Sequence, residues 1–220
     1  MINSARRYLK YQETLFMGAL TMWCFSLSVF RWMFAHSTMF LFLNWNLFLA
    51  FIPWAISSMA IMKPVIRFRR IWFAASLLLW LMFFPNAPYI LTDLFHLTPN
   101  LSMPLWFDLV LILSYAWTGL LFGFLSLLDI ERILKRSMPT NWVRLTSTML
   151  LFLTCFGIYL GRYLRWNSWD VVTEPFDLMG DISSMLIHPA HHPRTWGVTL
   201  FMGVLLNIMY WSFKLIRRRL

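Results

Sequence analysis

Six continuous apolar runs, each about 20 residues long, constrain this sequence more than any other feature. A helix of about 20 mostly apolar residues crosses the hydrocarbon core of a bilayer. Continuous runs, unlike alternating ones, exclude a membrane β-barrel. The sequence therefore predicts an all-α, polytopic integral membrane protein, a single domain over residues 1–220. Its six transmembrane helices are expected near residues 14–34, 39–62, 71–91, 106–128, 143–165 and 195–216.

The charge of the chain raises one alternative, because a formal net charge of +10 also suits a nucleic-acid-binding protein. However, the Lys and Arg residues form short clusters between the apolar runs, as membrane-flanking positive charge does. A chain that is 60% hydrophobic and 13% charged also has more apolar surface than one soluble core of this size can bury. We expect the lipid bilayer, and no nucleic acid, as the partner.

The basic residues also predict the orientation of the spans. Fifteen of the nineteen lie before the first run, after the last, in the connections that follow the second and fourth, or at the adjoining ends of the fifth and sixth runs (Arg144 and Lys214). Positive charge is retained in the cytoplasm, so both termini are expected inside. All five histidines and six of the nine acids then lie outside: His36, His96, His188, His191, His192, Asp93, Asp108, Asp170, Glu174, Asp177 and Asp181. The inner face is interpreted as simple anchoring charge, and the titratable chemistry is expected on the outer face.

The third span is expected to break at Pro85 and Pro88, where it reaches the outer leaflet. Each proline removes a backbone donor and disturbs the turn before it, and in lipid the freed carbonyls need partners. If an α-helix resumes after the break, its spacing puts four polar residues on one face. They are Asn86, Tyr89, Asp93 and His96.

Partners for this polar face are expected at the outer ends of the next two spans. Asp108 begins span four, with Tyr115 two turns further on the same face, while Arg162 and Arg165 share a face where span five ends. We expect a network of these arginines with several carboxylates and His96, although charges at helix ends often only snorkel or pair for structure.

Two further patterns have ordinary interpretations. The two Gly-x-x-x-Gly pairs, Gly119/Gly123 and Gly157/Gly161, are interpreted as helix-packing positions. His188 and His192 are four residues apart, which suits two metal ligands on one helical turn, but prolines bracket the segment and weaken the helix. No metal site is therefore assigned, and His96, His188 and His192 stay minority candidates. The whole connection over residues 166–194 is expected to form an outer cap or a re-entrant element rather than a slack linker.

Three runs carry a family resemblance: residues 84–97 (FPNAPYILTDLFHL), 106–109 (WFDL) and 157–170 (GIYLGRYLRWNSWD). They resemble the bacterial membrane family catalogued as domain of unknown function 1361, from span three to the C-terminus. The resemblance implies a small multi-pass protein of the bacterial cytoplasmic membrane. It brings no activity, but it favours the motifs of spans three to five over His188 and His191.

The first functional hypothesis is an enzyme that acts on a lipid or lipid-linked envelope substrate at the outer face. Asp93, His96 and Asp170 would supply acid–base chemistry. Guanidinium groups suit an anion, so the substrate would be held by Arg162 and Arg165, together with Asn86, Tyr89, Asp108 and Asn167. The sequence names no cofactor and no oligomeric state.

Two other hypotheses stay open. The first is a transporter or lipid flippase, because transporters place substrate at broken helices. Its only hint of a deeper path is Asn44 or Asn46, interpreted as near the centre of span two. The second is a non-catalytic assembly or scaffold subunit, in which the outer polar network only locks the bundle.

Overall fold

The computed structural model describes residues 4–62, 70–98, 103–166 and 170–217. Within these residues, six helices are long and apolar enough to cross a membrane, which confirms the predicted all-helical, multi-pass fold. These spans cover Arg7–Ala35, Phe42–Met62, Ile71–His96, Leu105–Leu134, Thr140–Tyr163 and Pro193–Arg217. By contact the chain divides into two compact units, Met1–Ile130 and Glu131–Leu220. The single domain expected over residues 1–220 stays a prediction.

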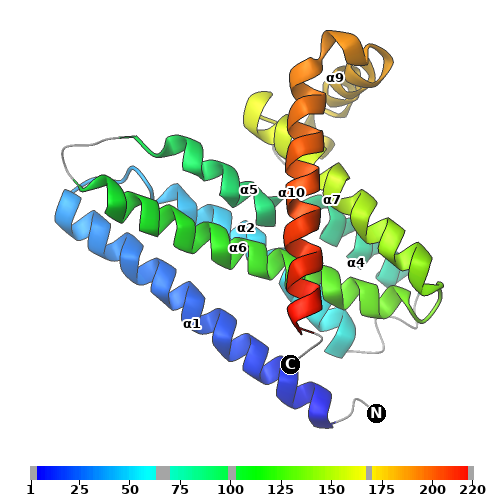
Figure 1. Cartoon of the computed structure of the whole chain (residues 1–220), viewed down its shortest axis with the longest axis horizontal. Helices are drawn as coiled ribbons and strands as arrows, with labels where there is room; N and C mark the ends of the chain where they lie inside the picture. Colours follow the sequence, from blue (N-terminus) through cyan, green and yellow to red (C-terminus); the bar gives the residue numbers. More distant parts are fainter. Residues whose placement is uncertain (1–3, 63–69, 99–102, 167–169, 218–220) are drawn as a thin grey trace. The chain divides into compact units, whose positions relative to one another are not determined.

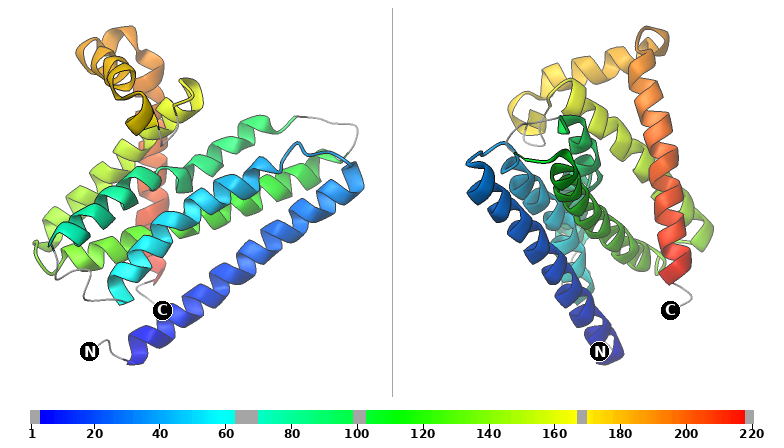
Figure 2. Two further views of the ribbon diagram at one scale, coloured as in Figure 1. Left: turned by 180° about the vertical axis from the view of Figure 1, so that it is seen from behind. Right: turned by 60° about the vertical axis from the view of Figure 1, so that its left-hand side comes forward.

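Unit 1 is built from long apolar helices that alternate in direction (Figures 1 and 2). Ion pairs join Lys10 to Asp129 and Arg31 to Asp108. The residue numbers increase along the first helix where they decrease along the helix that contains Asp108 and Asp129, so these two helices are antiparallel. Nε1 of Trp80 on the third span donates to the hydroxyl of Ser126, which lies near Asp129 on the same partner helix. The elements are α1 (Ser4–Ala35), α2 (Phe42–Met62), α4 (Arg70–Phe83), α5 (Asn86–Tyr89), η1 (Ile90–His96) and α6 (Leu105–Leu134), of which the unit includes residues up to Ile130.

The third span is made of bent pieces, as the prolines predict. The helix α4 ends at Phe83, the short helix α5 contains Pro88, and η1 then continues the chain as a 3-10 helix. Proline cannot donate to the preceding turn and its ring crowds it, so two prolines three residues apart favour a bend or a break in the helix. The expected α-helical spacing after the break is wrong for residues 90–96. Three residues complete a turn there, which puts Asp93 directly below His96.

Two glycines of α6 allow the broken span to approach closely. A Cβ atom added to Gly119 would lie 2.9 Å from the carbonyl oxygen of Ala87 and 2.8 Å from Cδ1 of Ile90. A Cβ atom added to Gly123 would lie 2.9 Å from Cβ of Ala87. Small residues let helix backbones meet in this way within a membrane. The predicted packing role of Gly119 and Gly123 is confirmed, and the segment they receive is the one that leads into η1.

Unit 2 contains a pair of antiparallel spans joined by shorter helices. Phe152 on the first span lies against Gly203 on the second, where an added Cβ atom would overlap Cδ1 of Phe152 unless that ring shifted, and Tyr163 meets Arg194 nearer the connection. The connection is helical in its described part, and its longest helix has 13 residues, too few to cross a bilayer. The elements are α7 (Thr140–Tyr163), α8 (Asp170–Thr173), α9 (Pro175–Ile187), η2 (Pro189–His191) and α10 (Pro193–Arg217).

Candidate functional site

A buried carboxylate and a half-exposed histidine lie together on η1, just after the proline break. Asp93 is 1% exposed, whereas the side chain of His96 is 45% exposed. Nδ1 of His96 is 4.0 Å from Oδ1 of Asp93. The contact follows from the 3-10 geometry, in which residues three apart lie one above the other. Thr92 tightens the same turn, because its hydroxyl donates to the carbonyl oxygen of Tyr89 at 2.7 Å.

The helix α2 supports both members of this pair. Nδ2 of Asn46 donates to Oδ2 of Asp93 at 2.9 Å. One turn earlier, the ring of Phe42 lies 5.3 Å from the ring of His96, centre to centre. Two residues one turn apart on α2 thus meet two residues one turn apart on η1. We call this group of four, Phe42, Asn46, Asp93 and His96, the Asp93–His96 cluster.

The remaining polar residues predicted on this face lie close by in the chain. Nδ2 of Asn86 donates to the carbonyl oxygen of Phe83 at 3.0 Å, which satisfies an acceptor at the end of α4. Tyr89 ends α5 and is partly exposed, as is Asn86. Both residues therefore belong to the break itself, and their predicted binding roles stay predictions.

Asp108 forms a separate buried ion pair with Arg31 of α1. Nε and Nη2 of Arg31 donate to the two carboxylate oxygens at 2.7 and 3.1 Å. Both side chains are 2% exposed, and the guanidinium lies 4.5 Å from the centre of the Phe40 ring. Sequence reasoning missed this partner. An arginine inside an apolar run was the available signal, because such a charge needs a partner within the membrane.

Tyr115 donates its hydroxyl to Oδ1 of Asn44 at 2.5 Å, and Nδ2 of Asn44 donates to the hydroxyl of Ser28 at 3.0 Å. The helix α2 begins at Phe42, so Asn44 and Asn46 lie in its first two turns. Their interpretation as polar residues near the centre of span two is wrong. The one hint of a deeper transport path is thereby removed, since these groups lie at a helix end.

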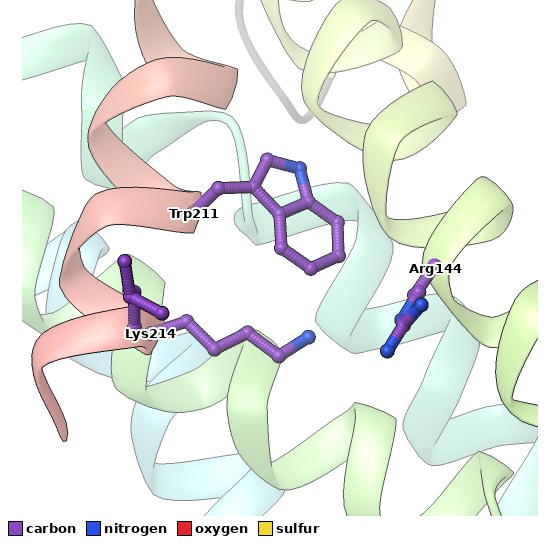
Figure 3. A pocket seen from close by; sticks show the side chains of 4 residues that line it. Arg144, Trp211 and Lys214 are labelled. Atoms are coloured by element: carbon purple, nitrogen blue, oxygen red, sulfur yellow. The ribbon is translucent and has the colours of Figure 1, made fainter. Parts of the chain in front are cut away.

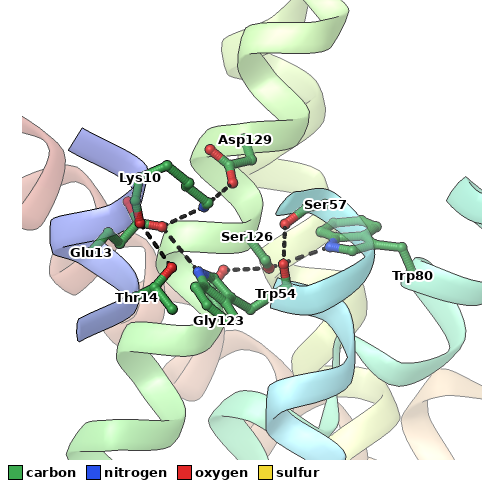
Figure 4. A network of polar contacts seen from close by, with 9 residues as sticks. All are labelled: Lys10, Glu13, Thr14, Trp54, Ser57, Trp80, Gly123, Ser126 and Asp129. Carbon is green, nitrogen blue, oxygen red and sulfur yellow. Dashed lines mark hydrogen bonds and ion pairs between the residues drawn. The ribbon is translucent and has the colours of Figure 1, made fainter. Parts of the chain in front are cut away.

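A second polar cluster lies at the opposite end of α1 and α6 (Figure 4). Nζ of Lys10 lies 2.6 Å from Oδ2 of Asp129 and also pairs with Glu13. Nε1 of Trp54 donates to Oε1 of Glu13 at 3.0 Å. The charged side chains are at most 10% exposed. These four residues, Lys10, Glu13, Trp54 and Asp129, form the Lys10 cluster.

Unit 2 holds a comparable cluster around Glu131, the first residue of that unit. The carboxylate lies 2.5 Å from Nζ of Lys214 and accepts hydrogen bonds from Tyr210 at 2.7 Å and Ser147 at 2.9 Å. Glu131 is 1% exposed and Lys214 5% exposed. The inner face was interpreted as simple anchoring charge. For Lys10 and Lys214 that interpretation is wrong, because each is buried against a carboxylate.

The site residues predicted beyond span four lie in unit 2. Arg162 is in the last turn of α7, Arg165 follows the helix with a positive φ of 63°, and Asp170 begins α8. Asn167 lies outside the described residues. The predicted network of these residues with Asp93 and His96 stays a prediction.

The histidines of the predicted minority metal site lie in and beside η2. The rings of His188 and His191 stack at 5.7 Å between centres, and Nε2 of His192 is 3.4 Å from the hydroxyl of Ser184. Over the described ranges, no three His, Cys, Asp or Glu side chains come close enough together to hold a metal ion. The described geometry thus gives no support to the minority metal candidates.

Comparison with protein families places these features in context. The family model described as protein of unknown function (DUF1361) matches residues 45–209, which include Asn46, Asp93, His96 and Glu131. Neither the curated proteins nor the solved structures that were compared gave a match. The match confirms the resemblance seen in spans three to five and extends it to most of α2. Because it covers well over half of the 220 residues, the chain belongs to the DUF1361 family.

Proposed function

We propose that the protein is a membrane enzyme that acts on a lipid or lipid-linked envelope substrate, with the Asp93–His96 cluster as its acid–base centre. The observation that carries the proposal is the pairing of a buried carboxylate with an imidazole that is 45% exposed, 4.0 Å away. A carboxylate or amide inside a membrane is costly and is commonly functional. A histidine at the edge of a membrane, in contrast, can exchange protons with substrate and water.

The chemistry follows from the ordinary properties of the two groups. A ring nitrogen of an imidazole can accept a proton and return it within one reaction cycle. The carboxylate of Asp93 lies beside one ring nitrogen at 4.0 Å, within the reach of an ion pair when the imidazole is protonated. Nδ1 of His96 faces Asp93, so Nε2 is the atom assigned to proton transfer with the substrate. Asn46 is a positioning residue, because it fixes the carboxylate rather than the imidazole.

The surroundings of His96 support a substrate with a lipid tail. The neighbouring Phe95 is 67% exposed, and the cluster lies at the ends of spans that cross a bilayer. Such a place presents a polar group to the headgroup layer and an aromatic ring to the acyl chains. A substrate with a lipid tail would put its polar part beside His96 and its tail in the bilayer. Water-soluble substrates would gain nothing from the exposed ring.

Asp93→Asn and His96→Asn test the proposal in a strain that lacks its own copy of the gene. Lipids and lipid-linked intermediates are extracted and compared by mass spectrometry after complementation with each variant. We expect at least one species to depend on the wild-type protein and to revert in both variants. His36→Asn is the matched control, because His36 is also exposed, belongs to the same unit, and has a φ of 47° that asparagine tolerates.

Identical lipid extracts from the deletion strain and the complemented strain would overturn the proposal. So would wild-type extracts from the strains carrying Asp93→Asn and His96→Asn. Protein in the membrane fraction is measured in the same cultures by immunoblot. A lost species that is matched by lost protein would make the Asp93–His96 cluster structural and would also contradict the assignment.

A further inference from the structure

A pocket in unit 2 lies between α7 and α10, away from any predicted site residue. Its volume is about 370 Å³, and it is lined by Arg144, Trp211, Lys214 and Leu215. Figure 3 shows the guanidinium of Arg144 and the ammonium of Lys214 pointing toward each other across the opening, with the indole of Trp211 beside them. Two cations that converge on one cavity repel each other unless an anion lies between them.

The charges around the pocket favour an anion. Glu131 pairs with Lys214, but it is 1% exposed and does not line the cavity. Lys135 reaches the same carboxylate at 3.9 Å. Arg144 is exposed and forms no ion pair with another residue of the described ranges. The lining therefore offers one cation whose charge is not compensated and one that is held in place.

We propose that this pocket binds the phosphate group of an anionic phospholipid. A planar guanidinium binds phosphate oxygens through paired hydrogen bonds, and a lysine adds a point charge. The lipid source is favoured over free phosphate by the apolar half of the site. Leu215 is 56% exposed on a membrane-spanning helix, and the partly exposed Trp211 suits the headgroup level of a bilayer. Basic pockets between transmembrane helices bind anionic headgroups in this way.

The test is native mass spectrometry of the purified full chain in detergent, titrated with phosphatidylglycerol or phosphatidylcholine. We expect the first phosphatidylglycerol to bind more tightly than phosphatidylcholine, and Arg144→Gln to weaken it about tenfold. Arg136→Gln is the matched control, because Arg136 is also exposed, carries the same charge and lies outside the lining. The control should bind as the wild type does.

Arg144 is exposed, so its replacement should leave the unfolding midpoint unchanged. Equal affinities of Arg144→Gln and Arg136→Gln for phosphatidylglycerol would overturn the proposal, as would equal binding of the two lipids by the wild type. Inorganic phosphate is added in a third arm. Displacement of phosphatidylglycerol by millimolar phosphate would assign the pocket to a soluble anion and contradict the lipid assignment.

Discussion

The two polar clusters of unit 1 share a helix but differ in their access to solvent. Asn46 and Trp54, which contact Asp93 and Glu13, are eight residues apart on α2, about 12 Å along its axis. In the Lys10 cluster every charged side chain is at most 10% exposed. In the Asp93–His96 cluster the carboxylate is as buried, but its imidazole partner is 45% exposed.

This difference separates two uses of buried charge in a membrane. A closed cluster contributes to holding α1, α2 and α6 together, since removal of one charge would leave its partners uncompensated. A cluster with one exposed titratable member can also meet a substrate. Burial alone therefore does not identify a functional site in this protein. The combination of a fixed carboxylate and an accessible imidazole distinguishes the Asp93–His96 cluster.

The largest expected effect comes from opening the closed cluster. Lys10→Met removes the cation between Glu13 and Asp129, and breaking a buried ion pair in this way should cost about 3–5 kcal/mol of unfolding free energy. Arg7→Met, one turn earlier and exposed, is the control and should cost less than about 1 kcal/mol. Reversible unfolding in detergent measures both. Equal losses would show that the Lys10 cluster has no special structural role.

A smaller effect is expected where α6 receives the broken span. Gly119→Ala would push against the carbonyl oxygen of Ala87 and against Ile90, which begins η1, and should cost about 1–3 kcal/mol of unfolding free energy. Gly18→Ala meets nothing within 4 Å and should be neutral or stabilise α1 by up to about 1 kcal/mol. If Gly119→Ala matches Gly18→Ala in unfolding experiments, the close packing of α5 on α6 does not support the Asp93–His96 cluster.

Asn46→Leu tests the role of a neutral residue of the Asp93–His96 cluster. It removes the amide that donates to Asp93 at 2.9 Å, and should cost about 1–2 kcal/mol of unfolding free energy. Asn141→Leu, at an exposed position, is the control and should change the unfolding free energy by less than about 0.5 kcal/mol. The lipid product in membranes should fall only with Asn46→Leu. A full yield of product from that variant would remove Asn46 as a positioning residue.

Local chemistry explains what could be predicted from the sequence. The six spans follow from the length of the apolar runs, and the break in the third follows from two prolines three residues apart, Pro85 and Pro88. Asp93 and His96 were identified as polar residues beside that break. Their mutual contact could be expected from spacing, but the 3-10 register of η1 could not, because it accompanies close packing on the glycines of α6.

The buried ion pairs could not be predicted, because each depends on which helices pack together. Arg31 and Asp108 are 77 residues apart in sequence, Lys10 and Asp129 are 119 apart, and Glu131 and Lys214 are 83 apart. The available signal was the position of Asp129 and Glu131 at the end of an apolar run, where a carboxylate needs a cation or several donors. Lys10 and Lys214 lie among other basic residues and were interpreted as anchors, so they were not considered as partners for these carboxylates.

The most direct test of the difference between the two clusters is the unfolding free energy of His96→Asn in detergent, measured on protein purified from the membranes that are assayed for the lipid product. Because His96 is half-exposed, we predict a change of less than about 0.5 kcal/mol together with loss of the product. A loss of stability as large as that of Lys10→Met, or a product retained at the wild-type level, would contradict the assignment of the Asp93–His96 cluster as a reactive site.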